Sequence, residues 1–371
     1  MLNLVRWRTI GLWLATSVIV ASGLILQQPA LALDAAGEQQ ILFAVARQDI
    51  IAERLDATID AIHTKLRAGK IGYIDLGGND RTLQVRIRAP ADVAKAKAAL
   101  ADLLLPTTPP PEESTSMTDW AITVLADWFS PASLDASIIE LSVEEPEQGL
   151  LNFNLTDAGI DFRLSRAIAS SIAVISYRID ELDLGEPAIE RQGIDRFLVK
   201  VSGVEDSHGV IGLLTLPANL TFQLVDQSIS AQQALDSRPP AGSRVLYTIE
   251  EPSMPYLVQD DVIVSGDSLL DAHADVDQRT SEPVVVFRFN DEGAKRFEQA
   301  TEENVGRPFA ILLDELVISA PIIREPIRNG FGQISGNFTE QSASDLAVLL
   351  RSGPLPATLK AIETHFVPAE P

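Results

Sequence analysis

The alternation of apolar and polar residues predicts two successive units with the same order of elements, strand-helix-strand-strand-helix-strand. In the first unit, residues 40–47 alternate as a strand and residues 49–69 carry apolar side chains at helical spacing. Two further strands flank the turn signal at residues 77–80. An Ala-rich helix at 91–105 and a strand at 137–143 complete the unit. This order is typical of a ferredoxin-like βαββαβ domain.

The second unit repeats this order from Leu150. Thr156 stands where a helix N-cap belongs, and Gly185 ends the long helix that follows. The predicted elements are, in order, strand 151–155, helix 156–185, strands 187–190 and 197–201, helix 208–214 and strand 220–224. We therefore predict a second ferredoxin-like domain.

A third region follows with a different order. Residues 284–289 form a β-branched and aromatic strand, and Asn290 caps the next helix. A hairpin surrounds the turn Asp314-Glu315, where Glu resists the positive φ of a type I′ turn. We therefore expect either another turn or mild strain. A Gly-rich loop at 322–336 and a helix capped by Thr339 close the region.

The predicted fold class is therefore α+β, with two ferredoxin-like (βαββαβ) base units and an α+β head domain. We predict these segments: a signal peptide or membrane anchor at 1–32, the first unit at 33–146 with a Pro-rich and helical insertion at 106–133, the second unit at 147–226, a linker at 227–258 and the head at 259–371.

The first 32 residues are predicted to be an export or anchoring segment. Arg6 and Arg8 precede a mostly apolar run at 10–26, and Ala30-Leu31-Ala32 forms a small-x-small cleavage pattern. Cleavage would leave a mature chain that starts at Leu33, whereas a retained segment would anchor it. Both outcomes place the remainder in the periplasm, either free or anchored to the inner membrane.

Composition narrows the classes of function. The chain has 371 residues, a net charge of −23 and no cysteine. The acidic balance argues against nucleic acid as a partner. The absence of cysteine excludes disulfides and thiolate chemistry. No HExxH, GxSxG or P-loop motif is present, so we expect no enzyme activity and no cofactor.

Two further features each allow two interpretations. Asp271, His273, Asp275 and Asp277 alternate along a strand, which suits either a metal site or an ordinary solvated strand face. Trp120 and Trp128 share one face of a short helix within the insertion. That helix either docks a partner or the membrane surface, or it covers a sheet edge and buries its own tryptophans.

Several short sequence motifs resemble those of SecD, the membrane subunit that assists protein export. The head resembles it through FNDEGA at 289–294, ISAP at 318–321, REPI at 324–327, GQISG at 332–336, DLA at 345–347 and LLRSGPLP at 349–356. The base resembles it through LGEP at 184–187, RQG at 191–193 and LTFQLVD at 220–226. The likeness covers residues 178–367 and is faint before residue 150. Residues 36–39 read AGEQ where SecD has a Gly-Gly motif.

The resemblance implies a SecD-like accessory of Sec-dependent protein translocation. Such a protein binds emerging unfolded polypeptides on the periplasmic side of the inner membrane. The implied partners are exported polypeptides, the inner-membrane surface, and SecYEG, SecF or a full-length SecD. SecD continues into five more membrane helices, whose ionisable groups are thought to couple proton flow to export. We therefore expect this chain not to conduct protons itself.

The Gly-rich loop is the candidate polypeptide-binding site. Arg324, Arg328, Phe331 and Gly332 would meet an extended chain through backbone and apolar contacts. Alternatively, the loop glycines serve turn geometry alone. Two other functions stay open: a structural assembly subunit that docks on a membrane complex, favoured by an exposed Trp120/Trp128 face, and a secreted hydrolase, favoured by a deep cleft with paired carboxylates.

Overall fold

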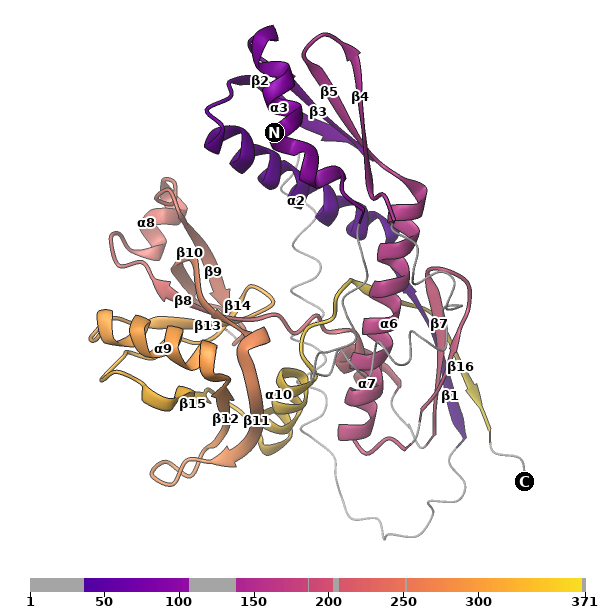
Figure 1. The fold of residues 1–371 in the computed structure, drawn as a ribbon. Helices are drawn as coiled ribbons and strands as arrows, with labels where there is room; N and C mark the ends of the chain where they lie inside the picture. The colour runs from indigo at the N-terminus through magenta and orange to yellow at the C-terminus, as the bar shows by residue number, and fades with distance from the viewer. Residues whose placement is uncertain (1–36, 107–137, 186, 203–206, 251, 369–371) are drawn as a thin grey trace.

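The computed structural model describes residues 37–106, 138–185, 187–202, 207–250 and 252–368 (Figure 1). The predicted N-terminal segment at 1–32 and both insertion tryptophans, Trp120 and Trp128, lie outside these ranges. Within them, none of the helices combines the length and apolar character that a membrane crossing requires. The described chain mixes helices and strands, so the α+β class is confirmed.

The base contains two four-stranded antiparallel sheets. The first sheet has the order β2 (Tyr73–Asn79), β3 (Thr82–Ile87), β5 (Leu150–Leu155), β4 (Leu141–Glu147). The second has the order β16 (Leu359–Val367), β1 (Glu38–Val45), β7 (Arg196–Ser202), β6 (Ala188–Arg191). The base helices are α2 (Arg47–Ala68), α3 (Val93–Leu100), α6 (Asp157–Glu181) and α7 (Ser207–Thr215).

The strand pairing corrects the prediction of two units that are each continuous in sequence. The first strands of the two predicted units are exchanged. β1 was expected in the first sheet but lies in the second, and β5 was expected in the second sheet but lies in the first. β16 lies where β8 (Leu220–Val225) was expected, and β8 pairs with strands of the head instead. Apolar alternation identifies a strand with one buried face, but it does not identify the partner strand.

Two long helices make this exchange of strands possible. α2 has 22 residues and carries the chain from the second sheet to the first, while α6 has 25 residues and returns it. At 1.5 Å per residue these helices are about 33 and 38 Å long. The buried carboxylate of Glu140 lies between them, 3.0 Å from Arg54 Nε of α2 and 2.7 Å from Arg163 Nη2 of α6.

The head contains a closed barrel and a three-stranded sheet. The barrel order is β10 (Pro255–Ser265), β8, β13 (Phe309–Leu313), β14 (Leu316–Ser319), β9 (Ser243–Thr248). The sheet order is β11 (Leu269–Val276), β12 (Pro283–Phe289), β15 (Phe331–Ser335). The head helices are α8 (Ala231–Asp236), α9 (Asp291–Glu303) and α10 (Glu340–Ser352).

The predicted linker at 227–258 is wrong. This stretch contains α8, β9 and the start of β10, and two of these elements complete the barrel. Its Ser- and Pro-rich composition resembles a solvated linker, and its strands are recognisable only once β8 and β14 are beside them. The predicted caps of α9 and α10 are confirmed: Asn290 accepts from Gly293 N and Thr339 accepts from Ser342 N.

The β13–β14 turn has positive φ at both central residues, 50° at Asp314 and 69° at Glu315. The hairpin therefore does not use another turn, and Glu315 carries the strain. The left-handed conformation costs a non-glycine residue about 1–2 kcal/mol, and glycine's extra unfolded-state entropy offsets about half of this cost. Glu315→Gly is expected to raise the free energy of unfolding by about 0.5–1 kcal/mol in urea titrations. A decrease would show that the Glu315 side chain stabilises the turn.

Candidate functional site

The segment before β15 is fastened to α9 and is not a free loop. Ile323 is buried, and its backbone N–H donates to Arg307 O at 2.9 Å. Ile327 N donates to the Thr301 hydroxyl of α9, also at 2.9 Å. These bonds hold the chain along the helix until a short 3₁₀ turn, η5 (Arg328–Gly330), leads into β15. The predicted loop at 322–336 therefore ends in a strand of the sheet.

The glycines of this segment have packing roles. Gly330 is buried with φ 67°, and an added Cβ would lie 2.7 Å from the Ala294 Cβ. Gly332 is opposite Phe287 on β12, where an added Cβ would lie 2.3 Å from the aromatic ring. This geometry supports the alternative interpretation of the glycines. Gly332 lies on the inner face, so its side-chain position offers nothing to a ligand.

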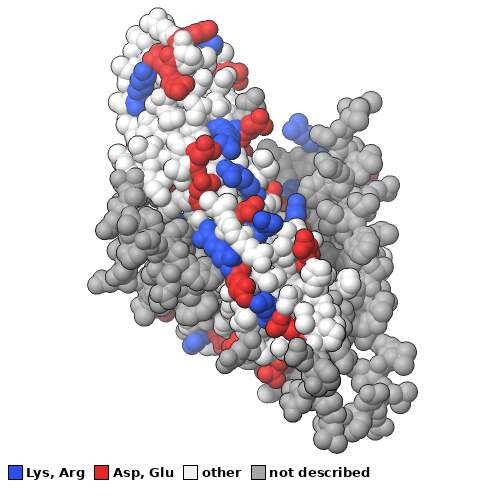
Figure 2. Space-filling view, turned by 90° about the vertical axis from the view of Figure 1, so that its right-hand side faces the viewer, with Lys and Arg blue, Asp and Glu red and all other residues white. Residues whose placement is uncertain are grey.

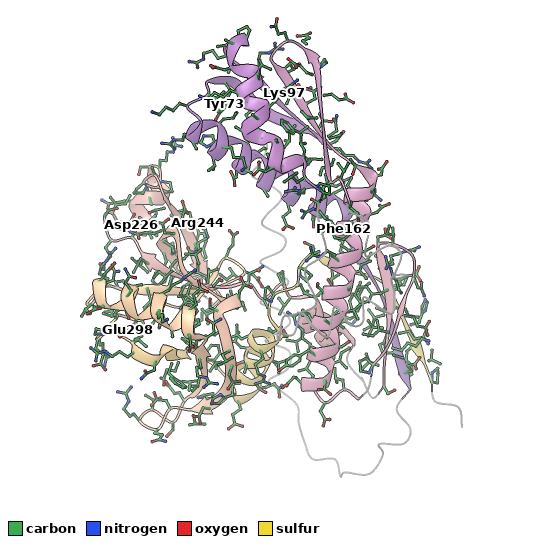
Figure 3. The ribbon with its side chains drawn as sticks, viewed as in Figure 1. Tyr73, Lys97, Phe162, Asp226, Arg244 and Glu298 are labelled. Carbon is green, nitrogen blue, oxygen red and sulfur yellow. The ribbon has the colours of Figure 1, made fainter. Side chains whose placement is uncertain are left out.

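The structure separates the predicted site residues. Phe331 is 53% exposed on the outer face of the sheet, and Arg288 Cζ lies 5.7 Å from its ring centroid. Arg328 instead lies beside α9, with Nε 3.6 Å from Glu298 Oε1. Glu298 is labelled on α9 in Figure 3. Arg324 is exposed and forms no ion pair with any other described residue. Phe331 and Arg288 therefore form the compact part of the site.

β15 is an edge strand. It pairs with β12 on one side, and no described strand is hydrogen-bonded to its other side. An edge strand presents unpaired backbone N–H and C=O groups that another extended chain can bind. The sequence patterns predicted neither this strand nor a role for Arg288 in the site. The alternation of β12 was the available signal for Arg288, because it places Arg288 on the outer face with Val286.

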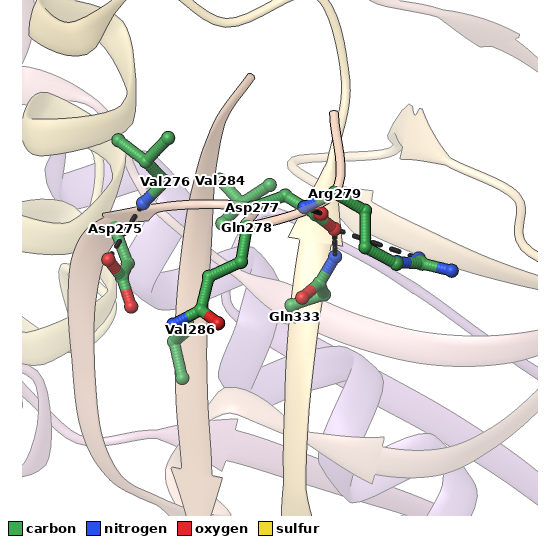
Figure 4. A pocket seen from close by; sticks show the side chains of 8 residues that line it. All are labelled: Asp275, Val276, Asp277, Gln278, Arg279, Val284, Val286 and Gln333. Atoms are coloured by element: carbon green, nitrogen blue, oxygen red, sulfur yellow. Dashed lines mark hydrogen bonds and ion pairs between the residues drawn. The ribbon is translucent and has the colours of Figure 1, made fainter. Parts of the chain in front are cut away.

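The outer face of this sheet has a shallow hollow of about 280 Å³ near the β11–β12 turn (Figure 4). Asp277 accepts hydrogen bonds from Gln333 Nε2 at 3.0 Å, Arg279 N at 2.8 Å and Thr280 N at 3.2 Å. The Gln333 amide and then the two backbone donors lower the pKa of Asp277 to about 2. An ionised Asp277 holds the turn against β15 and is unsuited to general acid chemistry at neutral pH.

The possible metal ligands do not converge. Asp271 and His273 are exposed on β11, with Oδ2 and Nδ1 3.7 Å apart, whereas Asp277 is held in the turn. Across the described ranges, no group of three or more acidic or histidine side chains is arranged to hold a metal ion. The described part of the chain therefore agrees with a solvated strand face at β11.

Two family models match the chain. The model described as "SecDF, P1 head subdomain" covers residues 243–357, and the one described as "Protein translocase subunit SecDF, P1 domain, N-terminal" covers residues 168–227. The α+β base and head thus define a chain of the P1 type found in protein translocase subunits. Over these two regions the chain is similar to SecD and SecDF, the protein translocase subunits that the two models describe.

Curated relatives extend this match over most of the chain. SecD of Calditerrivibrio nitroreducens is 30% identical over 347 residues, which cover 91% of this chain and 61% of the relative. SecD of Acetobacter pasteurianus is 33% identical, with 91% and 59% covered. SecD of Desulfurispirillum indicum is 38% identical over 237 residues, with 62% and 46% covered. The chain thus spans about half to three fifths of the length of these relatives.

Solved SecDF structures are also similar. "Crystal structure of SecDF in Super-membrane-facing form" has a TM-score of 0.45 and 32% identity, covering 54% of this chain and 28% of that one. "Structure and function of a membrane component SecDF that enhances protein export" has a TM-score of 0.43 and 30% identity, covering 60% and 96%.

Proposed function

We propose that this chain is a SecD-like accessory of Sec-dependent protein translocation. Its head binds emerging unfolded polypeptide on the periplasmic side of the inner membrane, where SecYEG, SecF or a full-length SecD are its partners. The supporting observation is that β15 is an edge strand and carries the exposed ring of Phe331. Similarity to SecD over most of the chain supports the cellular role, since these relatives are named protein translocase subunits.

The edge of β15 suits unfolded polypeptides of varied sequence, which are called clients below. An extended polypeptide that adds to a sheet edge is bound through its main chain, which every sequence shares. β15 has five residues, so only a short client segment is ordered at a time. Fixing each client residue costs about 1–2 kcal/mol of conformational entropy, and we therefore expect weak, reversible binding. Such binding would hinder backward movement of the client and still release it.

Phe331 adds an apolar contact to this backbone edge. The positively charged Arg288 guanidinium lies 5.7 Å from the centroid of the Phe331 ring. The exposed part of the ring is available to a side chain of the client. The chain carries a net charge of −23, so acidic clients are repelled and neutral or basic clients are favoured. Salt should weaken this preference.

Substitution of Phe331 tests the proposal. Phe331→Ala, alone or with Arg324→Ala, is expected to weaken binding of an alkylated, permanently unfolded polypeptide about tenfold, which corresponds to about 1.4 kcal/mol. Fluorescence anisotropy with the full chain at low and high salt measures the affinity. Both side chains are exposed, so thermal unfolding should stay unchanged.

Phe366→Ala is the matched control, because Phe366 is 57% exposed on β16, another edge strand. Its affinity for the unfolded polypeptide should equal that of the parent chain. The proposal fails if the parent shows no salt-sensitive binding, or if the Phe331 and Phe366 variants bind equally well.

A second candidate function is a structural subunit that docks on a membrane complex. The observation in its favour is that β16 exposes three apolar side chains, Ile362, Phe366 and Val367. On the side of the molecule shown in Figure 2, basic and acidic side chains are interleaved. A partner that docks there would therefore meet both charges and not a surface of one sign. Loss of co-purifying envelope proteins on Phe366→Ala, with polypeptide binding absent from the parent, would favour this function.

A further inference from the structure

The chain passes between base and head at two places, after α7 and after α10. The first crossing leads through Pro217 and Ala218 into β8, and the second leads through Gly353 and Leu355 into β16. The two crossings are bonded to each other, since Leu355 N donates to Pro217 O at 2.8 Å. In Figure 1 they lie where α6, α7 and α10 meet. Any change in the position of the head on the base must pass through this junction.

Arg178 of α6 lies beneath both crossings, and its side chain is fully buried. All three of its guanidinium nitrogens donate to the crossings or to the helices that precede them. The acceptors are Leu213 O at 2.9 Å, Leu214 O at 3.1 Å, Leu216 O at 2.7 Å, Ser352 Oγ at 2.9 Å and Gly353 O at 3.2 Å. One base residue therefore binds the C-terminal ends of α7 and α10 together.

The charge of Arg178 is balanced mainly by backbone carbonyls. Helix C-termini carry a partial negative charge, and α7 and α10 both end at this guanidinium. Burial lowers the pKa of Arg178 to about 10, while the nearby Asp314 carboxylate acts in the opposite direction. The group therefore stays protonated at neutral pH. Lysine lacks the planar fork that reaches five acceptors on two segments.

Asp314 of the β13–β14 turn holds the first crossing from the head side. Its Oδ2 accepts from Ala218 N at 3.0 Å, and its Oδ1 accepts from Asn219 N at 2.8 Å. Ala218 has φ 61°, a conformation that non-glycine residues rarely adopt, so the carboxylate holds a strained bend. Arg178 from the base and Asp314 from the head are thus both hydrogen-bonded to the backbone of the first crossing.

We propose that Arg178 and Asp314 form a clamp that sets the orientation of the head on the base. Both act as positioning residues, because each holds the backbone of a crossing and neither lies in the polypeptide-binding site. A third contact lies beside the clamp: Arg351 of α10 donates to Ala272 O at 2.6 Å and to Glu181 of α6. This inference does not rest on the proposed function.

The test measures the distance between base and head in the full chain. The chain has no cysteine, so Glu53→Cys on α2 and Glu302→Cys on α9, both exposed, are the only attachment sites for spin labels. We expect one narrow distance distribution in the parent chain. Arg178→Lys and Asp314→Asn should each broaden or shift it. Amide exchange of Leu355 should become about tenfold faster or more, because its bond to Pro217 loses support.

Arg166→Lys is the matched control, because Arg166 is an exposed arginine of the same helix that stacks on Phe162. It should leave the distance and the exchange unchanged. If Arg178→Lys does not fold, Asp314→Asn decides, since Asp314 is only half-buried and its bond to Asn219 N is exposed. The clamp is refuted if folded Asp314→Asn keeps the narrow distribution and the slow Leu355 exchange. Binding of unfolded polypeptide should stay at the parent level in every clamp variant, so this outcome is independent of the proposed function.

Discussion

Phe222→Ala is expected to lower the free energy of unfolding of the head by about 3–5 kcal/mol, the usual cost of truncating a buried phenylalanine. Phe222 lies on β8 and is fully buried. Its ring centroid lies 5.3 Å from Phe287, 5.2 Å from Phe289, 5.6 Å from Phe297 and 6.2 Å from Phe309. These rings belong to the sheet, to α9 and to the barrel. The cavity left by the missing Phe222 ring would therefore remove contacts among all three parts of the head.

Urea unfolding followed by circular dichroism measures this loss. Phe366→Ala, which truncates an exposed ring on β16, should change the free energy of unfolding by no more than about 0.5 kcal/mol. A loss below about 1 kcal/mol for Phe222→Ala would mean that the neighbouring rings close the cavity and that this cluster is not the centre of the head core.

Ending the chain at Asp226 is expected to abolish cooperative unfolding of the base. β16 pairs with β1 along its whole length, from Glu38 opposite Val367 to Val45 opposite Leu359. The truncation removes β16, takes Leu355 and Leu359 from the base core, and removes two acceptors of Arg178, Ser352 and Gly353. β8 would also remain without the barrel strands it pairs with.

A chain that joins residues 33–217 to 352–371 through a short Gly/Ser linker is the matched comparison. It lacks the head and retains β16, and the bond between Leu355 N and Pro217 O shows that the two joined ends lie close together. Differential scanning calorimetry should show a cooperative transition for this chain and a broad or absent one for the chain that ends at Asp226. A sharp transition in both would show that β16 is dispensable to the base.

Local patterns predicted several elements of the head. The caps Asn290 and Thr339, the strand before α9 and the hairpin at Asp314-Glu315 all lie where the sequence indicated. Caps, turns and one-sided burial are set by residues within a few positions of each other, so a single sequence contains the information. The strand within the Gly-rich stretch was missed because Gly332 is compatible with β15 only while the Phe287 ring covers it.

The candidate site divides in the same way. Phe331 could be predicted as an exposed contact, whereas its neighbour Arg288 and its separation from Arg328 depend on sheet pairing and on Glu298 of α9. Arg178 carried a weak signal, a charged residue within the apolar stripe of a long helix. Its acceptors lie at least 35 residues away along the chain, which is beyond the reach of any local pattern.

The sequence by itself determined the α+β class, the two long helices, the Thr156 cap of α6, the acidic charge and the resemblance to SecD. Only the tertiary structure decided which sheet each strand joins, that residues 227–258 complete a barrel, and that one buried arginine binds base to head. The physical reason is that alternation records only that one face of a strand is buried. The partner depends on contacts between distant residues, and β1 and β5 present the same pattern to either sheet.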